Sequence, residues 1–469
     1  MAGLNKYRAY PEYNFTNIEG LVQLPSHWEL KQVRYLLKNG AEGTKIGPFG
    51  SSLKLEDMVD DGVQVYGQEN VIKRDFSLGK RRISFNKFKE MGAYEVFFGD
   101  ILITMMGTSG KCEIVPQTAE KGIIDSHLIR VRVNNKLIIP DFFKLLVDES
   151  PEIKHQIKIQ GKGSIMLGLN SGVIRSLYLP LPGISEQKLI LGFLDYETKK
   201  IDNLIEKQQQ LIEFLKEKRQ AMISHAVTKG LNPDVPMKDS GVEWLGEVPE
   251  HWSVIPLKHV CALIKDGTHL PPPRVDNGIP LLSVRNIVDG VFQFRDDDSH
   301  ISHKDYKLLC SSFVPKKDDV LLAIVGATLG KVALVPEMGS FHIQRSLGVF
   351  RTNELILPQH LSYIFESKDF QNLLWENAGF SAQPGIYLGT LSNFCVPLPP
   401  VTEQLKISEF ITATVDKLDL LISQASRLIA LIQERRTALI SAAVTGKIDV
   451  RDWVAPDTQD IEASQEATA

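Results

Sequence analysis

The stretch LPLPGISEQ, from Leu179 to Gln187, points to an internal repeat, because nearly the same phrase, VPLPPVTEQ, returns from Val396 to Gln404. Each phrase runs straight into a long segment whose apolar residues recur at helical spacing. The segments resemble each other, KLILGFLDYETKKIDNLIEKQQQLIEFLKEKRQAMISHAVT in the first copy and LKISEFITATVDKLDLLISQASRLIALIQERRTALISAAVT in the second. A shared phrase followed by two similar helices indicates an internal duplication.

The duplication also covers the segments before the helices. LPSHWEL at 24–30 matches VPEHWSV at 248–254, and GDILITMMGTSGKCEIVP at 99–116 matches DDVLLAIVGATLGKVALVP at 318–336. These segments mix β-rich runs, such as DILITMM and LGVFR, with shorter helical patterns. The mixture predicts α+β domains with a largely antiparallel, twisted sheet.

The offset between the two copies shows where residues were inserted. It is 224 residues at Pro25, 220 at Gly110 and 217 at Pro180, and it stays at 217 through Thr228. Insertions therefore fall before the helices, where surface loops can take them up. Because one added residue would break a packed apolar stripe, both helices are predicted to be packed along their length.

The helices carry an apolar stripe at steps of three and four residues, with polar interruptions. Two arrangements are open: two amphipathic helices in one core, or an antiparallel pair that acts as a spacer between two domains. The duplication favours the spacer. Ser185 and Thr402 are the expected N-caps, and Gly230 and Gly446 the expected C-terminal stops. The residues assigned to the seam are Leu204, Leu211, Leu215, Leu421, Leu428 and Ile432.

The predicted fold class is therefore α+β: two domains of mixed α/β structure joined by two long, antiparallel, coiled-coil-like helices, with a pseudo-twofold internal repeat. The predicted order is an N-terminal segment, a first domain, a first helix, a Pro- and Gly-punctuated linker, a second domain, a second helix and an acidic, disordered tail. The boundaries are 1–20, 21–182, 183–230, 231–245, 246–399, 400–447 and 448–469.

Composition sets broad limits. The chain has 469 residues, 43% hydrophobic, with a formal charge of −4, so any nucleic-acid surface must be local. Four scattered cysteines without a CxxC pair argue against a zinc site or a disulfide framework and favour a reducing compartment. No apolar signal core and no bilayer-length apolar run are seen, so a cytoplasmic protein is expected.

Three stretches resemble catalytic motifs. GTSGKC at 107–112 and GATLGKV at 326–332 are too short for a phosphate loop and lack its Ser or Thr, so tight turns between strands are expected. DSH at 125–127 has the residue types of a hydrolase triad, but neighbouring strand residues would point apart. PDFFKLLVDESPEIK at 140–154 imitates a nuclease pattern, yet reads as helical where a nuclease needs strands. No motif for adenine methylation or nucleotide binding appears, so the chain is expected to be non-catalytic.

Basic residues gather locally, for example in VIKRDFSLGKRRISFNKFKE at 71–90. Such a run is often only a solvated face, but the recurrence of basic residues in the second copy favours DNA binding through phosphates and base edges. The candidate DNA-binding residues are Lys45, Ser51, Ser52, Lys73, Arg74, Lys80, Arg81 and Arg82 in the first half, and Thr268, His269, Arg274, Arg285 and Arg345 in the second.

These features resemble one known family, the specificity subunit of type I restriction–modification systems. The resemblance runs from about Leu21 to Lys447 and rests on the paired entries PLPGISEQ and PLPPVTEQ, the exits EKRQAMISHAVTKG and ERRTALISAAVTGK, and the linker DSGVEWLGEVPEHW. The openings IGPFGSSLK at 46–54 and DGTHLPPP at 266–273 are also similar to known starts of such domains. The first half departs from the pattern, with FTNIEGLVQLPSHW where the second has the clean linker.

The resemblance implies a concrete function. Each domain would read one half of a bipartite, asymmetric site in double-stranded DNA, and the helices would set the gap. Methyltransferase subunits that bind S-adenosylmethionine, expected to be two, would dock on this chain at the seam residues named above. An ATP- and Mg-dependent motor-nuclease subunit would join for cleavage. No cofactor, metal or membrane is expected on the chain itself. Two other classes remain open from the residues alone, a nuclease of unfamiliar fold and a coiled-coil scaffold that binds no DNA.

Overall fold

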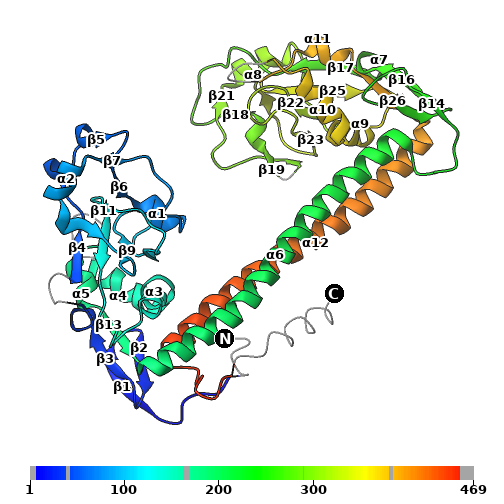
Figure 1. Cartoon of the computed structure of the whole chain (residues 1–469). Coiled ribbons are helices and arrows are strands. Elements are labelled where there is room, and N and C mark those ends of the chain that lie inside the picture. Colours follow the sequence, from blue (N-terminus) through cyan, green and yellow to red (C-terminus); the bar gives the residue numbers. More distant parts are fainter. Residues whose placement is uncertain (1–6, 39–42, 162–168, 289, 380–383, 455–469) are drawn as a thin grey trace. The chain divides into compact units, whose positions relative to one another are not determined.

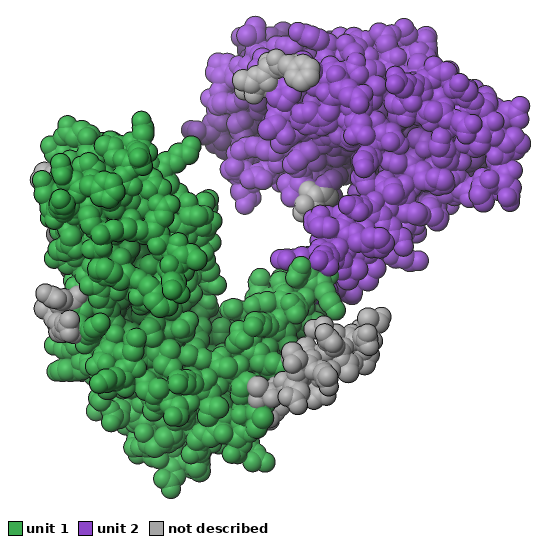
Figure 2. Space-filling view, in the orientation of Figure 1, with its two compact units in different colours: residues 1–207, 427–469 green, residues 208–426 purple. Residues whose placement is uncertain are grey.

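The computed structural model describes residues 7–38, 43–161, 169–288, 290–379 and 384–454. It divides into two compact units, unit 1 with residues 1–207 and 427–469 and unit 2 with residues 208–426 (Figure 2). Two long helices, α6 (Ile184–Lys229) and α12 (Val401–Val444), each begin in one unit and end in the other (Figure 1). None of the helices in the described ranges is long and apolar enough to cross a membrane.

Unit 1 holds the first domain. Its helices are α1 (Gln68–Ile72), α2 (Phe85–Glu90), α3 (Pro140–Glu149), α4 (Pro151–Gly161) and α5 (Ser171–Ser176). Its strands are β1 (Tyr13–Ile18), β2 (Leu21–Pro25), β3 (Glu29–Gln32), β4 (Thr44–Ile46), β5 (Met58–Val59), β6 (Val63–Tyr66), β7 (Arg82–Ile83), β8 (Glu95–Val96), β9 (Ile101–Thr104), β10 (Cys112–Ile114), β11 (Gly122–Ile124), β12 (Leu128–Val131) and β13 (Tyr178–Leu181).

Unit 2 holds the second domain. Its helices are α7 (Leu257–Val260), α8 (His303–Cys310), α9 (Pro358–Glu366), α10 (Lys368–Glu376) and α11 (Leu388–Ser392). Its strands are β14 (Met237–Asp239), β15 (Glu247–Pro249), β16 (Ser253–Pro256), β17 (Cys261–Asp266), β18 (Ile279–Leu282), β19 (Ile287–Val288), β20 (Val291–Phe292), β21 (His300–Ile301), β22 (Val320–Ala323), β23 (Val332–Leu334), β24 (His342–Ile343), β25 (Leu347–Thr352) and β26 (Cys395–Leu398).

The sheets of the two units correspond to each other. In unit 1 a four-stranded sheet has the order β10-β9-β12-β4, and in unit 2 the same order appears as β23-β22-β25-β17 within a six-stranded sheet. All neighbours in this shared order are antiparallel, while β6 and β11, β18 and β24, and β20 and β23 pair in parallel. The largely antiparallel α+β domains predicted from the repeat are therefore confirmed.

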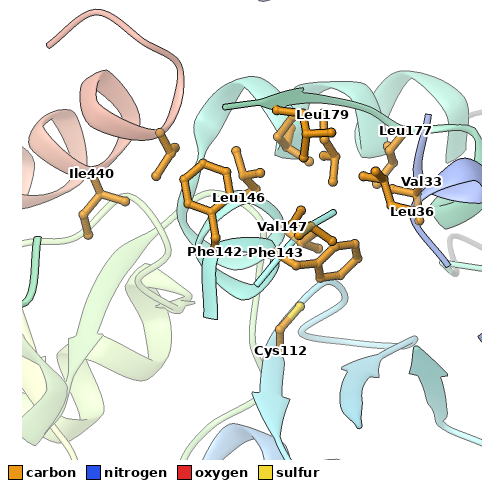
Figure 3. Packing of buried hydrophobic residues seen from close by; sticks show 14 of the residues in the cluster. Val33, Leu36, Cys112, Phe142, Phe143, Leu146, Val147, Leu177, Leu179 and Ile440 are labelled. Atoms are coloured by element: carbon orange, nitrogen blue, oxygen red, sulfur yellow. The ribbon is translucent and has the colours of Figure 1, made fainter. Parts of the chain in front are cut away.

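The core of unit 1 lies between this sheet and α3. Phe142, Phe143 and Leu146 on α3 are fully buried and pack among residues of the sheet, β13 and the 3₁₀ turn Val33–Tyr35 (Figure 3). Ile440, near the end of α12, belongs to the same cluster. Because the last part of α12 is built into this core, the first domain is completed by residues from the far end of the chain.

The repeated phrase is explained by one buried glutamine in each copy. Gln187 Oε1 accepts from the Ile139 N–H at 2.8 Å, and its Nε2 donates to the carbonyls of Leu137 and Pro182 at 2.9 Å. In unit 2, Gln404 bonds in the same way to Leu357, Leu355 and Pro399, each at 2.8 Å. Both glutamines are 0% exposed. Each ties the start of a long helix to the turn before it and to the segment that leads into α3 or α9.

The glutamate of the phrase makes a second anchor. Glu186 accepts from the hydroxyl of Tyr10 at 2.7 Å and lies 3.0 Å from the Nε2 of His27. Glu403 lies 2.8 Å from the Nε2 of His251 and accepts from the indole of Trp252 at 3.1 Å. The histidine of the HW pair that precedes β3 and β16 is thus fastened to the helix start in both copies, and in the second copy the tryptophan is as well, while β13 and β26 pair with those strands.

The expected helix ends were partly wrong. α6 begins at Ile184 and α12 at Val401, so Ser185 and Thr402 lie inside the first turn and are not N-caps. Gly230 and Gly446 do follow the helices, at φ +80 and +76. A Cβ on Gly446 would lie 2.4 Å from Pro25, and one on Gly230 would lie 3.2 Å from Trp252, so only glycine lets each helix end meet its strand segment.

The predicted tail, 448–469, was also partly wrong. Ile448 and Val450 are buried in the core of unit 1, and Trp453 stacks edge-on against Phe193. The N–H of Asp449 donates to the carbonyl of Arg8 at 2.8 Å, so the segment after α12 contacts the segment before β1 in this unit. Residues 455–469 lie outside the described residues, as do residues 1–6 of the predicted N-terminal segment.

The predicted seam was off by one residue in the middle of both helices. Leu215 is buried and Ile432 packs against the core of unit 1, as predicted. Four other leucines of the predicted set are 42–51% exposed, namely Leu204, Leu211, Leu421 and Leu428. The buried or half-buried positions are Ile201, Ile205, Gln208, Ile212, Leu215 and Met222 in α6 and Leu418, Ile422, Ala425, Ile429, Ile432 and Leu439 in α12. Leucines one residue before these positions satisfy the same spacing, which is why the sequence pattern alone chose the wrong register.

Candidate nucleic-acid interface

A tight turn joins β11 to β12 in unit 1 and is held by backbone hydrogen bonds on every side. The N–H of Asp125 donates to the carbonyl of Tyr66 at 2.9 Å, and the carbonyl of His127 accepts from Met105 at 2.9 Å. The N–H of Leu128 closes the turn on the Asp125 carbonyl at 3.2 Å. The buried Asp125 carboxylate also accepts from the His127 N–H and pairs with Arg81 Nη2, both at 2.9 Å. The turn is therefore rigid, while the His127 side chain stays exposed.

Unit 2 has the same turn between β24 and β25. The N–H of Gln344 donates to the carbonyl of Leu282 at 2.9 Å, and the carbonyl of Ser346 accepts from Ile324 at 2.9 Å. The N–H of Leu347 closes the turn on the Gln344 carbonyl at 3.1 Å. The middle residue, Arg345, is exposed.

A glycine brings a second loop onto each turn. The N–H of Gly47 donates to the carbonyl of Leu128 at 3.0 Å, and that of Gly267 donates to the carbonyl of Leu347 at 3.1 Å. A Cβ on Gly47 would lie 1.8 Å from the Asp125 carbonyl oxygen, and one on Gly267 would lie 2.3 Å from that of Gln344. No side chain fits at either position, so the glycines fix the loops that follow β4 and β17 against the turns.

The predicted basic residues of unit 1 differ in what their side chains contact. Arg81 joins the turn through Asp125, whereas Arg82 pairs with Glu120 at 2.8 Å and lowers the pKa of that carboxyl. Arg74, in the left-handed region at φ 56, lies 3.5 Å from Glu113 and lines a cavity of about 330 Å³ beside α3. Elsewhere, Lys45 lies over the Tyr94 ring, Ser51 and Ser52 belong to the 3₁₀ turn Gly50–Ser52, and Lys73 and Lys80 are exposed.

In unit 2 four of the five candidates lie on the loop after β17 or on the turn it touches. Thr268 bridges to Gln344, and its carbonyl accepts from the Arg345 N–H at 3.2 Å. Arg274 is exposed further along that loop. His269 also lies on this loop but is held by Asp266 at 2.6 Å, while Arg285 is tied to Asp297 at 3.0 Å. A role in DNA binding stays a prediction for all these residues.

The stretch Asp125–His127 is a turn, so the expectation that its side chains point apart was wrong. Ser126 Oγ lies 3.4 Å and Asp125 Oδ2 3.5 Å from His127 Nδ1. A hydrolase triad needs serine and aspartate on opposite ring nitrogens, whereas here both approach the same one. The arrangement therefore does not provide a general base for Ser126.

The other two motif-like stretches are structural. The glycines of GTSGKC and GATLGKV turn between the antiparallel pairs β9–β10 and β22–β23, as predicted. The nuclease-like stretch forms α3 and α4, and its Glu152 accepts from Ser441 and Lys447 at 2.8 Å, which fastens α4 to the end of α12. Within the described part of the chain, no group of three metal-ligating side chains comes together.

One ion pair that recurs in both domains was not predicted from the sequence. Arg132 Nε and Asp100 Oδ1 lie 2.7 Å apart across the sheet of unit 1, and Arg351 and Asp319 make the same 2.7 Å contact in unit 2. The aspartates stand in the aligned segments GDILIT and DDVLLA. A comparison of the polar residues at equivalent positions of the repeat could therefore have predicted this pair.

The helices carry apolar side chains on an exposed flank beside the seam. In unit 1 these are Leu204, Leu428 and Leu431, at 51, 43 and 62% exposure. In unit 2, Leu211, Phe214 and Leu421 are 42, 61 and 47% exposed. Each precedes a seam position by one residue, and an offset of 217 relates the α6 residues to those of α12. We call these two sets the apolar flank. Repeated exposed apolar residues beside a buried seam are typical of a docking surface.

The geometry of two matching domains, each with a rigid, loop-flanked turn, agrees with a comparison against known families. Residues 61–213 and 249–428 match the model of the type I restriction modification DNA specificity domain. The chain belongs to this family. The resemblance found from the repeated phrases is confirmed, and the match favours the DNA-reading alternative over a nuclease or a DNA-free scaffold.

Full-length relatives support the assignment. The chain is 25% identical over 459 residues to the MjaVIII specificity subunit of Methanocaldococcus jannaschii, covering 94% of this chain and 98% of that protein. It is 24% identical over 463 residues to the EcoBI specificity subunit of Escherichia coli, covering 97% and 93%.

Solved structures show the same fold. A chain from a study of complex assembly and conformational transition in a type I R-M system aligns with TM-score 0.66 and 16% identity, covering 91% of this chain and 99% of that one. The HsdS subunit from Thermoanaerobacter tengcongensis aligns with TM-score 0.50 and 15% identity, covering 91% and 98%.

Proposed function

We propose that this chain is the DNA-specificity subunit of a type I restriction–modification complex. The observation that carries the proposal is the turn after β11 and its counterpart after β24. Both are held by equivalent backbone bonds, yet they present Asp125, Ser126 and His127 in one unit and Gln344, Arg345 and Ser346 in the other. One framework with two different sets of polar side chains suits two domains that read different half-sites of a bipartite, asymmetric sequence.

DNA binding also requires phosphate contacts, and the exposed cations of both domains are suited to make them. Lys73, Lys80 and Arg274 are exposed and form no ion pair within the described ranges, so they are available for phosphates. Phosphate contacts supply affinity without sequence information and make it fall with salt. We assign these three residues to phosphate contacts that position the DNA. The domains that hold the turns would read the bases of each half-site.

The helices serve as spacer and docking platform in this proposal. The apolar flank occurs once in each unit, which fits two methyltransferase subunits, each bringing S-adenosylmethionine. An ATP- and Mg-dependent motor-nuclease subunit would join for cleavage. The chain itself would perform no chemistry and act in the cytoplasm.

Methylation mapping tests the proposal. The chain is co-expressed with its methyltransferase partner, and methylated adenines are mapped genome-wide. We expect one bipartite motif with an unspecified gap, and replacement of residues 246–399 by the matching domain of a relative should change one half-site only. Methylation without a bipartite motif, or a change of both half-sites in the exchange, would refute the proposal.

A further inference from the structure

Arg345 lies at the tip of a turn that the fold holds on all sides. Its N–H donates to the carbonyl of Thr268 at 3.2 Å, and Gln344 before it donates to Leu282 at 2.9 Å. After it, the carbonyl of Ser346 accepts from Ile324 at 2.9 Å. The backbone is therefore fixed, and only the guanidinium is free to move.

The Arg345 guanidinium is exposed and makes no ion pair within the described residues. In this it differs from Arg285, Arg295 and Arg351 of the same domain, which are paired with Asp297 or Asp319 at 3.0 Å or less. A planar fork with five donors on a rigid backbone is the arrangement that binds the O6 and N7 of a guanine in two hydrogen bonds.

The equivalent turn of unit 1 has a different charge pattern. Its arginine, Arg81, comes from before β7 and is engaged by the buried Asp125, so it braces the turn and is not free at the tip. The exposed side chain is His127, which stands 219 residues before Ser346. The backbone of the turn is the same in both domains, while the exposed polar side chain differs. This is expected if the side chain determines the preferred DNA sequence and the backbone contacts determine stability.

We propose that these two turns read bases: Arg345 recognises a guanine in the half-site of the second domain, and His127 contacts a base in the half-site of the first. The proposal rests on the proposed DNA-reading function and adds which side chains decide the sequence. Gly47 and Gly267 support these base-reading turns, because each holds the neighbouring loop against its turn.

The test uses the assembled complex with its methyltransferase subunits and a library of DNA duplexes with a randomised half-site. Arg345→Ala should lose preference for one guanine and weaken binding of the best site by about 10- to 100-fold. Arg345→Lys keeps the charge but not the planar fork, so it should weaken the same preference without abolishing it. The other half-site should stay unchanged in both variants, whereas His127→Ala should relax one position in that other half-site only.

Arg274→Ala is the matched control, because Arg274 is also exposed and without an ion pair in the described ranges. As a phosphate contact, it should weaken all sequences alike and reduce the salt slope by about one unit. If Arg345→Ala behaves like Arg274→Ala, or if both Arg345 variants keep every base preference, the inference is wrong. A wild-type complex without any sequence preference would instead refute the proposed function.

Discussion

Arg436 of α12 and Asp202 of α6 pair with Nε and Oδ1 2.9 Å apart in unit 1, and Arg219 and Asp419 exchange these roles in unit 2, at 3.2 Å. Each arginine also lies 3.8 Å from a glutamate of its own domain, Glu149 at the end of α3 or Glu366 at the end of α9. Because the chain carries one such set in each unit, the helix pair is joined to both domains by the same contacts. The sequence repeat therefore encodes the same junction between helix and domain in both units.

The buried glutamines should dominate the stability of these junctions. Gln187→Ala or Gln404→Ala leaves one backbone N–H and two carbonyls without their partner in a buried site, at a cost of about 2–4 kcal/mol in the free energy of unfolding. Urea unfolding measures the loss, with the exposed Gln209→Ala as control, expected within about 0.5 kcal/mol of wild type. Equal stability of all three variants would mean that the glutamines do not fasten the helices.

The register of the helix pair predicts a contrast between neighbouring leucines. Leu215 is 7% exposed and Leu211 is 42% exposed. Leu215→Ala should lower the free energy of unfolding by about 2–4 kcal/mol, because it opens a cavity in the seam. Leu211→Ala should cost less than about 1 kcal/mol. A larger loss in the Leu211 variant, seen in the same urea titration, would restore the register first predicted from the sequence.

The apolar flank should govern partner binding. Leu428→Asp with Leu431→Asp adds two charges to the flank of unit 1 at exposed positions, so the chain should stay folded while one methyltransferase subunit is lost. Native mass spectrometry of the co-purified complex measures the stoichiometry, which should fall from two to one. The control is Gln209→Asp with Gln433→Asp, exposed polar positions that also add two charges and should leave it at two. Two bound subunits in the Leu428 and Leu431 variant would exclude this docking surface.

Unit 2 should lose stability in acid through His360. This residue of α9 is 0% exposed, its ring nitrogens have no partner within the described structure, and burial lowers its pKa to about 3. The unfolded chain takes up this proton below about pH 6.5, so stability should fall by about 1.4 kcal/mol per pH unit from there down to the folded pKa.

His360→Phe removes this proton uptake and should flatten that part of the pH dependence. Exposed His259→Phe serves as the control and should retain the wild-type slope. The measurement is the free energy of unfolding between pH 4 and 7. A slope unchanged by His360→Phe would show that the buried histidine is not the acid-sensitive group.

Much of this structure could be predicted from the repeat, because duplicated phrases mark positions with the same structural task. The two domains, the helix limits to within three residues, and the glycine turns followed from matched segments and offsets. The seam register did not, since Leu204 and Leu211 have the same spacing as the half-buried Ile205 and Ile212. The turn at Asp125 was missed because a short DSH motif between strands gives no turn signal, and its tertiary contacts with Tyr66 and Gly47 lie far away in sequence.

We propose that the helices fix the distance between two separately reading domains. One heptad inserted after Gln209 and another after Ser426 lengthens both helices by about 10 Å and preserves the seam. DNA advances by about 3.4 Å per base pair, so methylation mapping should show a gap up to about three base pairs longer, with the bases of both half-sites unchanged. An active complex with the wild-type gap would contradict the claim and leave the helices as a docking surface alone.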